Sequence, residues 1–384
     1  MQNKELFVKH PRIFLTSALV VAAGLATSVS LPAPSPVRAR TADGVVEEAT
    51  RPDPAKPKKA TKPKKLVIAA AGNIACDPKN PSFNSLRGSK TACHMRRVSG
   101  LLLNRAGRPR YKTVLALGDN QYVCGGLRAY QRSYGKTWGR VYKVTKPVVG
   151  DKDYRTTLNA PHGTDCTNPP GRAAGFFEYF DGIKKVKPRP ADGPGAGAYY
   201  SFNVPAGCRP SDKVCWHVIA LNGNCRKAKG CEPGTLQYDW LEADLAAHGS
   251  SDYACTLAFW HWPRFSSGKH GSDPTYDSIW RLLYQHDVDV VLNAHEHVYE
   301  RFAPQNPDGV RDKARGIRQF TVGTGGASHV KFPSAQRLPT SQASSDDTFG
   351  ILRLKIRADS YTWRFVPEPG KRFSDASASP TACH

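Results

Sequence analysis

The feature that most constrains this chain is an apolar strand pattern that ends abruptly in an acidic turn. In the stretch VLALGDNQY, residues 114–122, the apolar run leads directly into Gly118 and Asp119. Ligands of open α/β sheets bind at the carboxyl ends of strands, so Asp119 is a candidate site residue. Taken alone, this carboxylate could equally open a turn.

Four other apolar runs end in the same way, and this repetition favours a site. Their polar ends are Asn73 (LVIAAAGN), Asp151 (KPVVGDKDY), His261 (TLAFWHWP), and His295 with His297 (VDVVLNAHEH). With Asp119 and Tyr122 they supply oxygen and imidazole donors and no thiolate. This donor set favours a borderline or hard divalent or trivalent metal ion. The two histidines of AHEH alternate, so at a strand end they would share one face.

Five short motifs follow one another in a fixed order. They are GN at 72–73, GDNQY at 118–122, GDKD at 150–153, HWP at 261–263 and AHEH at 294–297. In these motifs the chain resembles the metallophosphoesterases, also called calcineurin-like phosphoesterases, and within them the purple acid phosphatase-like branch. The resemblance covers roughly residues 66–365. It implies a four-layer αββα sandwich and a centre with two metal ions, with Fe, Mn and Zn as the candidates.

The resemblance also implies a ligand set for each ion. One ion would be held by Asn73, Asp119, Tyr122 and His297, and the other by Asp119, Asp151, His261 and His295. Asp119 would then bridge two cations about 3.5–4 Å apart, which share a solvent-derived hydroxide and the phosphoryl oxygens. For Tyr122, a buried aromatic side chain is the structural alternative.

Four positions depart from the family pattern, one of which is Trp262, where the family has a second His after His261. Asn73 stands where the family has Asp, and Asp151 stands where it has Asn, so one negative charge moves from one metal to the other. Lys152 replaces the family's catalytic His. A lysine with an ordinary pKa near 10.4 is a poor proton donor at neutral pH, although nearby dications would lower its pKa, and it could instead act as a fixed cation. These changes predict a retuned site.

The predicted function is an exported, metal-dependent phosphoesterase, with Asp119 and Lys152 as candidate catalytic residues. A phosphomonoesterase that attacks phosphorus with a metal-bound hydroxide is expected. The alternative is a catalytically weak or inactive family member that binds phosphorylated or anionic cell-envelope polymers. Arg264, Arg301 and Asn222 are candidate substrate contacts. A salt bridge inside the fold is an equal alternative for each arginine, and a turn is the alternative for Asn222.

The order of expected elements predicts a mixed α/β (α+β) fold. Strands are expected at 66–71, 112–117, 146–149, 198–204, 214–221, 254–260, 288–293, 317–323, 349–356 and 361–366. Helices are expected at 92–105, 127–135, 235–248 and 275–286. Early β-α alternation favours parallel strands, and the late strands without helices favour antiparallel pairing. Two mixed sheets flanked by helices satisfy both. The irregular insertion at 155–198 could be a substrate-selecting rim or a surface excursion.

The first 65 residues are not expected to belong to this fold. Residues 1–30 have basic residues followed by an apolar run, as in a secretory signal peptide, with an uncleaved anchor as the alternative. Residues 31–65 form a basic linker rich in Pro and Lys, whose composition is typical of disorder. Residues 66–384 are the predicted catalytic domain. After cleavage we expect no membrane span and a secreted, extracellular protein, with cell-wall association as an option.

Cysteine content and charge agree with export and with anionic partners. All ten cysteines lie beyond residue 65, and an even number in an exported chain predicts disulfides. Proximity favours the pairs Cys76–Cys93, Cys208–Cys215 and Cys225–Cys231. The net charge is +23, of which the first 65 residues account for +7. This charge attracts phosphoesters and other anions, and no recognition motif for specific nucleic-acid binding accompanies it.

Overall fold

The computed structural model describes residues 66–155, 172–183, 197–212, 214–249, 253, 255–334 and 337–384. These residues belong to one compact unit, Thr61–His384. The expected signal peptide and linker lie outside the described residues, as does most of the insertion at 155–198. No helix of the described part is both long enough and apolar enough to cross a membrane.

One sheet contains the first three strands of the chain and its last three. Its order is β13 (Thr381–Ala382), β12 (Ser360–Pro367), β11 (Gly350–Ile356), β1 (Leu66–Ala71), β2 (Thr113–Leu117) and β3 (Thr145–Val148). The strands β1, β2 and β3 are parallel, and β11 returns antiparallel to β1. The carboxyl ends of β1, β2 and β3 therefore lie at one edge of this sheet.

The second sheet has seven strands and is also mixed. Its order is β10 (Ser341–Ser345), β8 (Tyr299–Phe302), β9 (Arg318–Val322), β7 (Val290–Asn293), β6 (Cys255–Phe259), β5 (Trp216–Ala220) and β4 (Tyr200–Val204). Here β5, β6, β7 and β9 are parallel, while β4, β8 and β10 are antiparallel to their neighbours. The carboxyl ends of β6 and β7 also share an edge.

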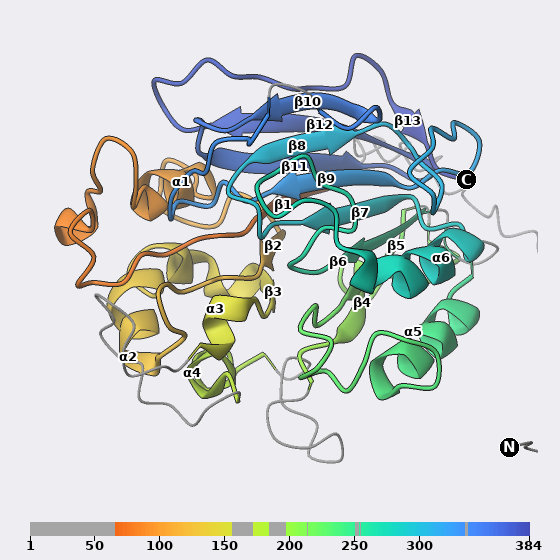
Figure 1. Cartoon of the computed structure of the whole chain (residues 1–384), viewed down its shortest axis with the longest axis horizontal. Coiled ribbons are helices and arrows are strands. Elements are labelled where there is room, and N and C mark those ends of the chain that lie inside the picture. The colour runs from red at the N-terminus through yellow and green to blue at the C-terminus, as the bar shows by residue number, and fades with distance from the viewer. Residues whose placement is uncertain are drawn as a thin grey trace, which may run out of the picture. The chain divides into compact units, whose positions relative to one another are not determined.

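Helices flank the two sheets (Figure 1). They are α1 (Met95–Leu101), α2 (Leu127–Ala129), α3 (Asp151–Tyr154), α4 (Ala174–Tyr179), α5 (Leu236–Ala247) and α6 (Asp277–Gln285). Short helices of 3-10 or π type lie at Asn84–Leu86, Tyr130–Tyr134, Trp138–Val144 and Pro274–Tyr276. In Figure 1, α5 and α6 lie together beside the strands of the second sheet, while α1 to α4 lie on the other side.

Alternating side chains of each strand divide the core into layers. Val218, Leu257 and Val290 point into the large core that contains side chains of both sheets. Their neighbours Ile219 and Ala258 point the other way, into the core formed with α5 and α6. This period of two is what a sheet covered on both faces requires. The predicted fold class, two mixed sheets flanked by helices, is confirmed.

Several expected elements differ in extent. The helix expected at 92–105 is only Met95–Leu101, because the preceding Cys93 has a left-handed φ of +63° and cannot be helical. Strands β8 and β10 were not predicted, since YERF and SQASS lack an apolar alternation. Helix α4 was also not predicted, because it lies in the segment interpreted as an irregular insertion.

Four disulfides join cysteines of the described residues. They are Cys76–Cys93, Cys208–Cys215, Cys225–Cys231 and Cys255–Cys383. The three pairs expected from proximity are confirmed. The fourth pair joins the start of β6 to the chain end, 128 residues later, so sequence proximity could not have predicted it.

Candidate metal centre

The predicted ligands lie at the carboxyl ends of strands in both sheets. Asn73 and Asp119 each follow their strand, β1 or β2, by two residues, and Asp151 follows β3 at the first residue of α3. From the second sheet, His261 follows β6 and His295 follows β7. Two sheet edges therefore present their polar ends to one another.

The backbone at this edge is bent into unusual conformations. Asn73, Asp119 and His295 have φ values of +55°, +47° and +58°, in the left-handed region. Non-glycine residues adopt this region at an energetic cost, and such residues cluster at functional sites. His295 and His297 therefore do not alternate on a strand as expected. They lie in the connection between β7 and β8, whose sharp turn the sequence pattern did not reveal.

Two glycines allow the strand ends to approach closely. A Cβ atom on Gly118 would lie 2.6 Å from His261 Nδ1, and one on Gly150 would lie 2.2 Å from Asp119 Oδ1. Gly118 also has a φ of +85°. A side chain at either position would separate the groups that form the centre.

Asp119 lies at the middle of the arrangement and is almost completely buried. Its Oδ1 accepts a hydrogen bond of 2.9 Å from the Lys152 backbone N–H and lies 3.3 Å from His261 Nε2. Its Oδ2 accepts a hydrogen bond of 2.7 Å from the Tyr122 hydroxyl. The two carboxylate oxygens therefore face two different groups of side chains.

The first group consists of Asp151, His261 and His295. Asp151 Oδ1 lies 3.5 Å from His261 Nε2 and 3.4 Å from His295 Nδ1. One donor atom from each of the three residues fits within 4.8 Å, a spacing suitable for a shared metal ion.

The second group consists of Tyr122 and His297. The Tyr122 hydroxyl lies 3.2 Å from His297 Nε2. Asn73 donates its side-chain amide to the backbone carbonyl of His295, 3.1 Å away, which leaves its Oδ1 without a hydrogen-bond partner. All seven predicted ligands are thus brought together.

Backbone carbonyls fix which nitrogen of two histidines faces the centre. His261 Nδ1 lies 2.8 Å from the Leu117 carbonyl, and His297 Nδ1 lies 2.9 Å from the Ser328 carbonyl. Because a carbonyl only accepts, each Nδ1 carries a proton, and Nε2 is the nitrogen that a metal ion could bind. This pattern is typical of histidines that bind metal ions.

Several buried polar atoms at the centre have no hydrogen-bond partner. Asn73 Oδ1, Asp151 Oδ1, His261 Nε2 and His295 Nδ1 are all buried without a hydrogen bond. Native proteins satisfy nearly all such atoms, and a metal ion is a partner that could satisfy several of them together. The residues present therefore fit a metal ion chemically.

The pKa shifts of the side chains also agree with a site that could hold a cation. Burial lowers the pKa of His261, but Asp119 and Asp151 outweigh burial and raise this pKa to about 10. Burial raises the pKa of Asp119, as does Asp151, yet the positive charges of His261 and Lys152 bring its pKa below the ordinary value. In the protein alone, protons on His261 and Lys152 therefore balance the two carboxylates, which is the role a metal ion would take.

Lys152 lies beside the centre and is partly exposed. Its ammonium donates to Asp151 and lies 3.8 Å from Asp119 Oδ2. Burial lowers its pKa, but these two carboxylates raise it above the ordinary value. A cation at this position is suited to contact an anionic ligand of the centre.

Asp153, in the same motif, had no role assigned from the sequence. It is fully buried and accepts hydrogen bonds from the loop at 118–122 and from the turn before α3. Burial and then Asp119 raise its pKa to about 6. The second acidic residue of GDKD was visible in the sequence, but nothing there revealed that it joins two of the motifs.

The three candidate substrate contacts have partners elsewhere in the fold. Arg301 pairs with Asp375 through Nε and Nη2 at 2.7 and 3.0 Å. Arg264 pairs with Asp277 at 3.1 Å. Asn222 is buried and donates to the Tyr154 hydroxyl and the Gly197 carbonyl, both at 2.9 Å. These contacts agree with the structural alternatives considered for each residue.

Comparison with known proteins identifies relatives of part of the chain. No family model matches it. The chain is 26% identical over 211 residues to the protein named Probable purple acid phosphatase 20 of Arabidopsis thaliana, covering 53% of this chain and 45% of that protein. It is 32% identical over 167 residues to Purple acid phosphatase 21 of the same plant, covering 41% and 34%. The chain thus spans less than half the length of these curated relatives.

Solved structures show the same fold. Purple acid phosphatase PPD1 from yellow lupin seeds (Lupinus luteus) aligns with a TM-score of 0.56 and 16% identity, over 81% of this chain and 53% of that chain. The structure of PhoD aligns with a TM-score of 0.50 and 12% identity, over 82% and 68%. At such identities the likeness concerns the fold alone.

Proposed function

Because the chain belongs to the metallophosphoesterase superfamily, in its purple acid phosphatase-like branch, we propose that it is a metal-dependent phosphoesterase acting on phosphomonoesters. Less than half of each curated relative is matched, so the activity is inferred from the site. The family membership and the donor groups at the strand ends support the same conclusion.

One observation carries the proposal, namely that the two oxygens of Asp119 face two separate donor groups. Oδ1 faces His261, which belongs to the group with Asp151 and His295. Oδ2 faces Tyr122, which contacts His297. We therefore infer that Asp119 would serve both groups of residues that would hold metal ions.

When bound, metal ions of this kind activate water and neutralise charge on the phosphoryl oxygens. The protein positions the ligand side chains and fixes which of their atoms carry protons. The Leu117 and Ser328 carbonyls hold the protons of His261 and His297 away from the centre. Asp119 holds the Tyr122 hydroxyl, whose pKa burial and then Asp119 raise well above its ordinary value.

Lys152 replaces a neutral or cationic imidazole of the family with an ammonium. Its contact with Asp151 and its distance of 3.8 Å from Asp119 Oδ2 support a role in pairing with a phosphoryl oxygen. We assign it the role of a fixed cation beside the centre and not of a proton donor. Replacing Lys152 with Gln should lower kcat/KM about 100-fold while metal content stays unchanged.

The central test measures metal content by elemental mass spectrometry, together with hydrolysis of an aryl phosphate in Mn, Zn or Fe. We expect about two metal ions per chain in the unchanged protein. His261→Ala and His297→Ala should each reduce this content toward one ion, because each removes a ligand from a different group. Asp119→Asn should lose both metal and turnover.

A surface variant controls for nonspecific damage. Asp308→Asn alters an exposed carboxylate that pairs with Arg281, so metal content and turnover should be unchanged. Absence of bound metal together with no turnover in any of the three ions would refute the proposal. Equal metal loss from His261→Ala and Asp308→Asn would refute the ligand assignment.

Export is part of the proposal. The four disulfides of the described residues suit an oxidising compartment, and the basic apolar start of the sequence is typical of a signal peptide. Detection of the protein in culture medium with residues 1–30 removed would test it.

A further inference from the structure

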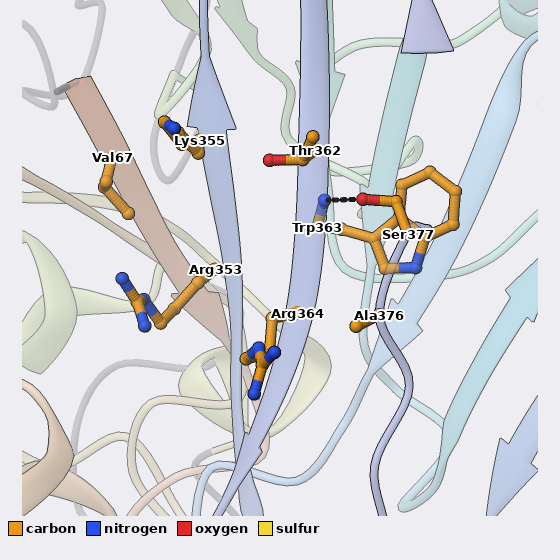
Figure 2. A pocket seen from close by; sticks show the side chains of 8 residues that line it. All are labelled: Val67, Arg353, Lys355, Thr362, Trp363, Arg364, Ala376 and Ser377. Atoms are coloured by element: carbon orange, nitrogen blue, oxygen red, sulfur yellow. Dashed lines mark hydrogen bonds between the residues drawn. The ribbon is translucent and has the colours of Figure 1, made fainter. Parts of the chain in front are cut away.

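Two neighbouring hollows are lined by cations and, among the described residues, by no carboxylate. The smaller, about 240 Å³, lies on the face of the first sheet where β1, β11 and β12 adjoin (Figure 2). The larger, about 550 Å³, lies at the beginnings of β1, β2 and β3 and shares Val67 and Arg353 with the smaller. We call both together the basic groove. Its cations are Arg110, Lys112, Lys143, Lys146, Arg353, Lys355 and Arg364.

Two arginines of the basic groove lie directly opposite each other. Arg353 on β11 pairs in register with Arg364 on β12, and both side chains line the same hollow (Figure 2). Like charges in this position destabilise a sheet. Arg353 Nε is buried without a hydrogen bond. Among the described residues, no carboxylate lies within ion-pair distance of either arginine.

The basic groove is separate from the candidate metal centre. The larger hollow is lined by Leu66, Thr113 and Val144, at or just before the first residues of β1, β2 and β3. The centre lies beyond the carboxyl ends of the same strands. A strand of four to six residues is roughly 13–20 Å long, so one small ligand cannot occupy both places.

The crowding of cations constrains the ligand. A sphere with the volume of the larger hollow is about 10 Å across, yet five cations line it. An anionic polymer with one charge per sugar-sized repeat would place only about two charges there. The chain's own first 65 residues carry twelve basic and five acidic side chains, so they would be repelled. Closely spaced phosphates suit both the guanidinium and the ammonium groups.

We propose that the basic groove binds a linear phosphate polymer. The polymer would cross strands β12 and β11 and continue into the larger hollow, with its charges neutralised by successive cations. Release of counterions from such a polymer drives binding and makes the affinity strongly dependent on salt. Tyr111 and Phe202 line the larger hollow and add apolar surface to it.

The test measures binding of fluorescently labelled, medium-chain inorganic polyphosphate over a range of salt concentrations. The groove variant replaces Arg110, Lys112 and Lys143, all exposed, with Gln. Each neutralised contact removes about 0.7 from the slope of log affinity against log salt, so this variant should lose about 2. Its affinity at physiological salt should fall about tenfold or more. Arg364→Gln, in the smaller hollow, should weaken binding independently and reduce the slope by a smaller amount.

A matched control replaces Arg311, Lys313 and Arg372 with Gln. These exposed cations line neither hollow, and the control carries the same net charge as the groove variant. It should retain affinity and slope, and so should Asp119→Asn, which alters the metal centre. Equal weakening in the control variant would overturn the proposal, because binding would then depend on net charge alone. Loss of binding in Asp119→Asn but not in the groove variant would overturn it too. Equally tight binding of orthophosphate would exclude a polymer site.

Discussion

Asp153 is the residue whose replacement should most clearly test how the metal centre is supported. Its carboxylate accepts five hydrogen bonds from three segments of the chain. The donors are Gly150 N at 2.8 Å, Asn120 N at 3.3 Å, Asn120 Nδ2 at 3.0 Å, Gln121 N at 3.3 Å and the Tyr130 hydroxyl at 2.5 Å. Asp153 therefore joins the loop that carries Asp119 to the turn that carries Asp151.

The expected loss of folding stability follows from the number of these donors. In Asp153→Ala four of these donors would be buried without a partner, because only Asn120 Nδ2 keeps another acceptor, the Val148 carbonyl; each of the four costs about 1–3 kcal/mol. Even the lower value gives about 4 kcal/mol, which is close to the whole stability of a marginally stable domain. Asp153→Asn keeps one acceptor oxygen but turns an amide N–H₂ toward the remaining donors. We expect it to lose about 2–3 kcal/mol and to remain folded.

Urea unfolding followed by tryptophan fluorescence measures both losses, and metal content of the folded Asp153→Asn protein measures the effect on the centre. Tyr130→Phe removes a single donor and should cost about 1 kcal/mol. Asp308→Ala, which removes an exposed ion pair, should cost less than about 1 kcal/mol. If Asp153→Ala were no more destabilising than Asp308→Ala, the proposed clamp would be refuted.

Three further predictions follow from the fold. Gly118→Ala should sharply lower metal content, because its Cβ would lie 2.6 Å from the His261 ring at a φ of +85°, whereas Gly207→Ala, at a positive φ in open space, should not. Burial raises the pKa of Asp289 to about 7 from an ordinary 3.8. The native state thus holds a proton that the unfolded chain releases, so stability falls as pH rises from about 4 to 7, and Asp289→Asn should remove on the order of 2–4 kcal/mol of that fall in urea titrations at pH 5 and 8. Replacing the Cys255–Cys383 pair with Ser should lower stability by about 5 kcal/mol, against about 2 for a disulfide closing a six-residue loop; equal losses would contradict this loop-length argument.

The sequence by itself determined the strands and which residue types stand at their ends. Apolar alternation and polar strand ends are local properties, and they predicted β1, β2, β5, β6 and β11 to within a few residues. Motif order was sufficient to indicate the family and the layered fold. The seven predicted ligands could be proposed without a structure, because they lie within a few residues of the ends of five apolar runs.

Only the tertiary structure decided how these ends meet. Asn73 contacts His295 across 222 residues of sequence, and this contact depends on the packing of the two sheets. The same packing gives Arg301 its partner Asp375 and makes Asp153 a clamp between two motifs. The opposition of Arg353 and Arg364 depends on strand register, which no local pattern specifies. Local periodicity determines which side of a strand a residue faces, but long-range packing determines which residues it contacts on that side.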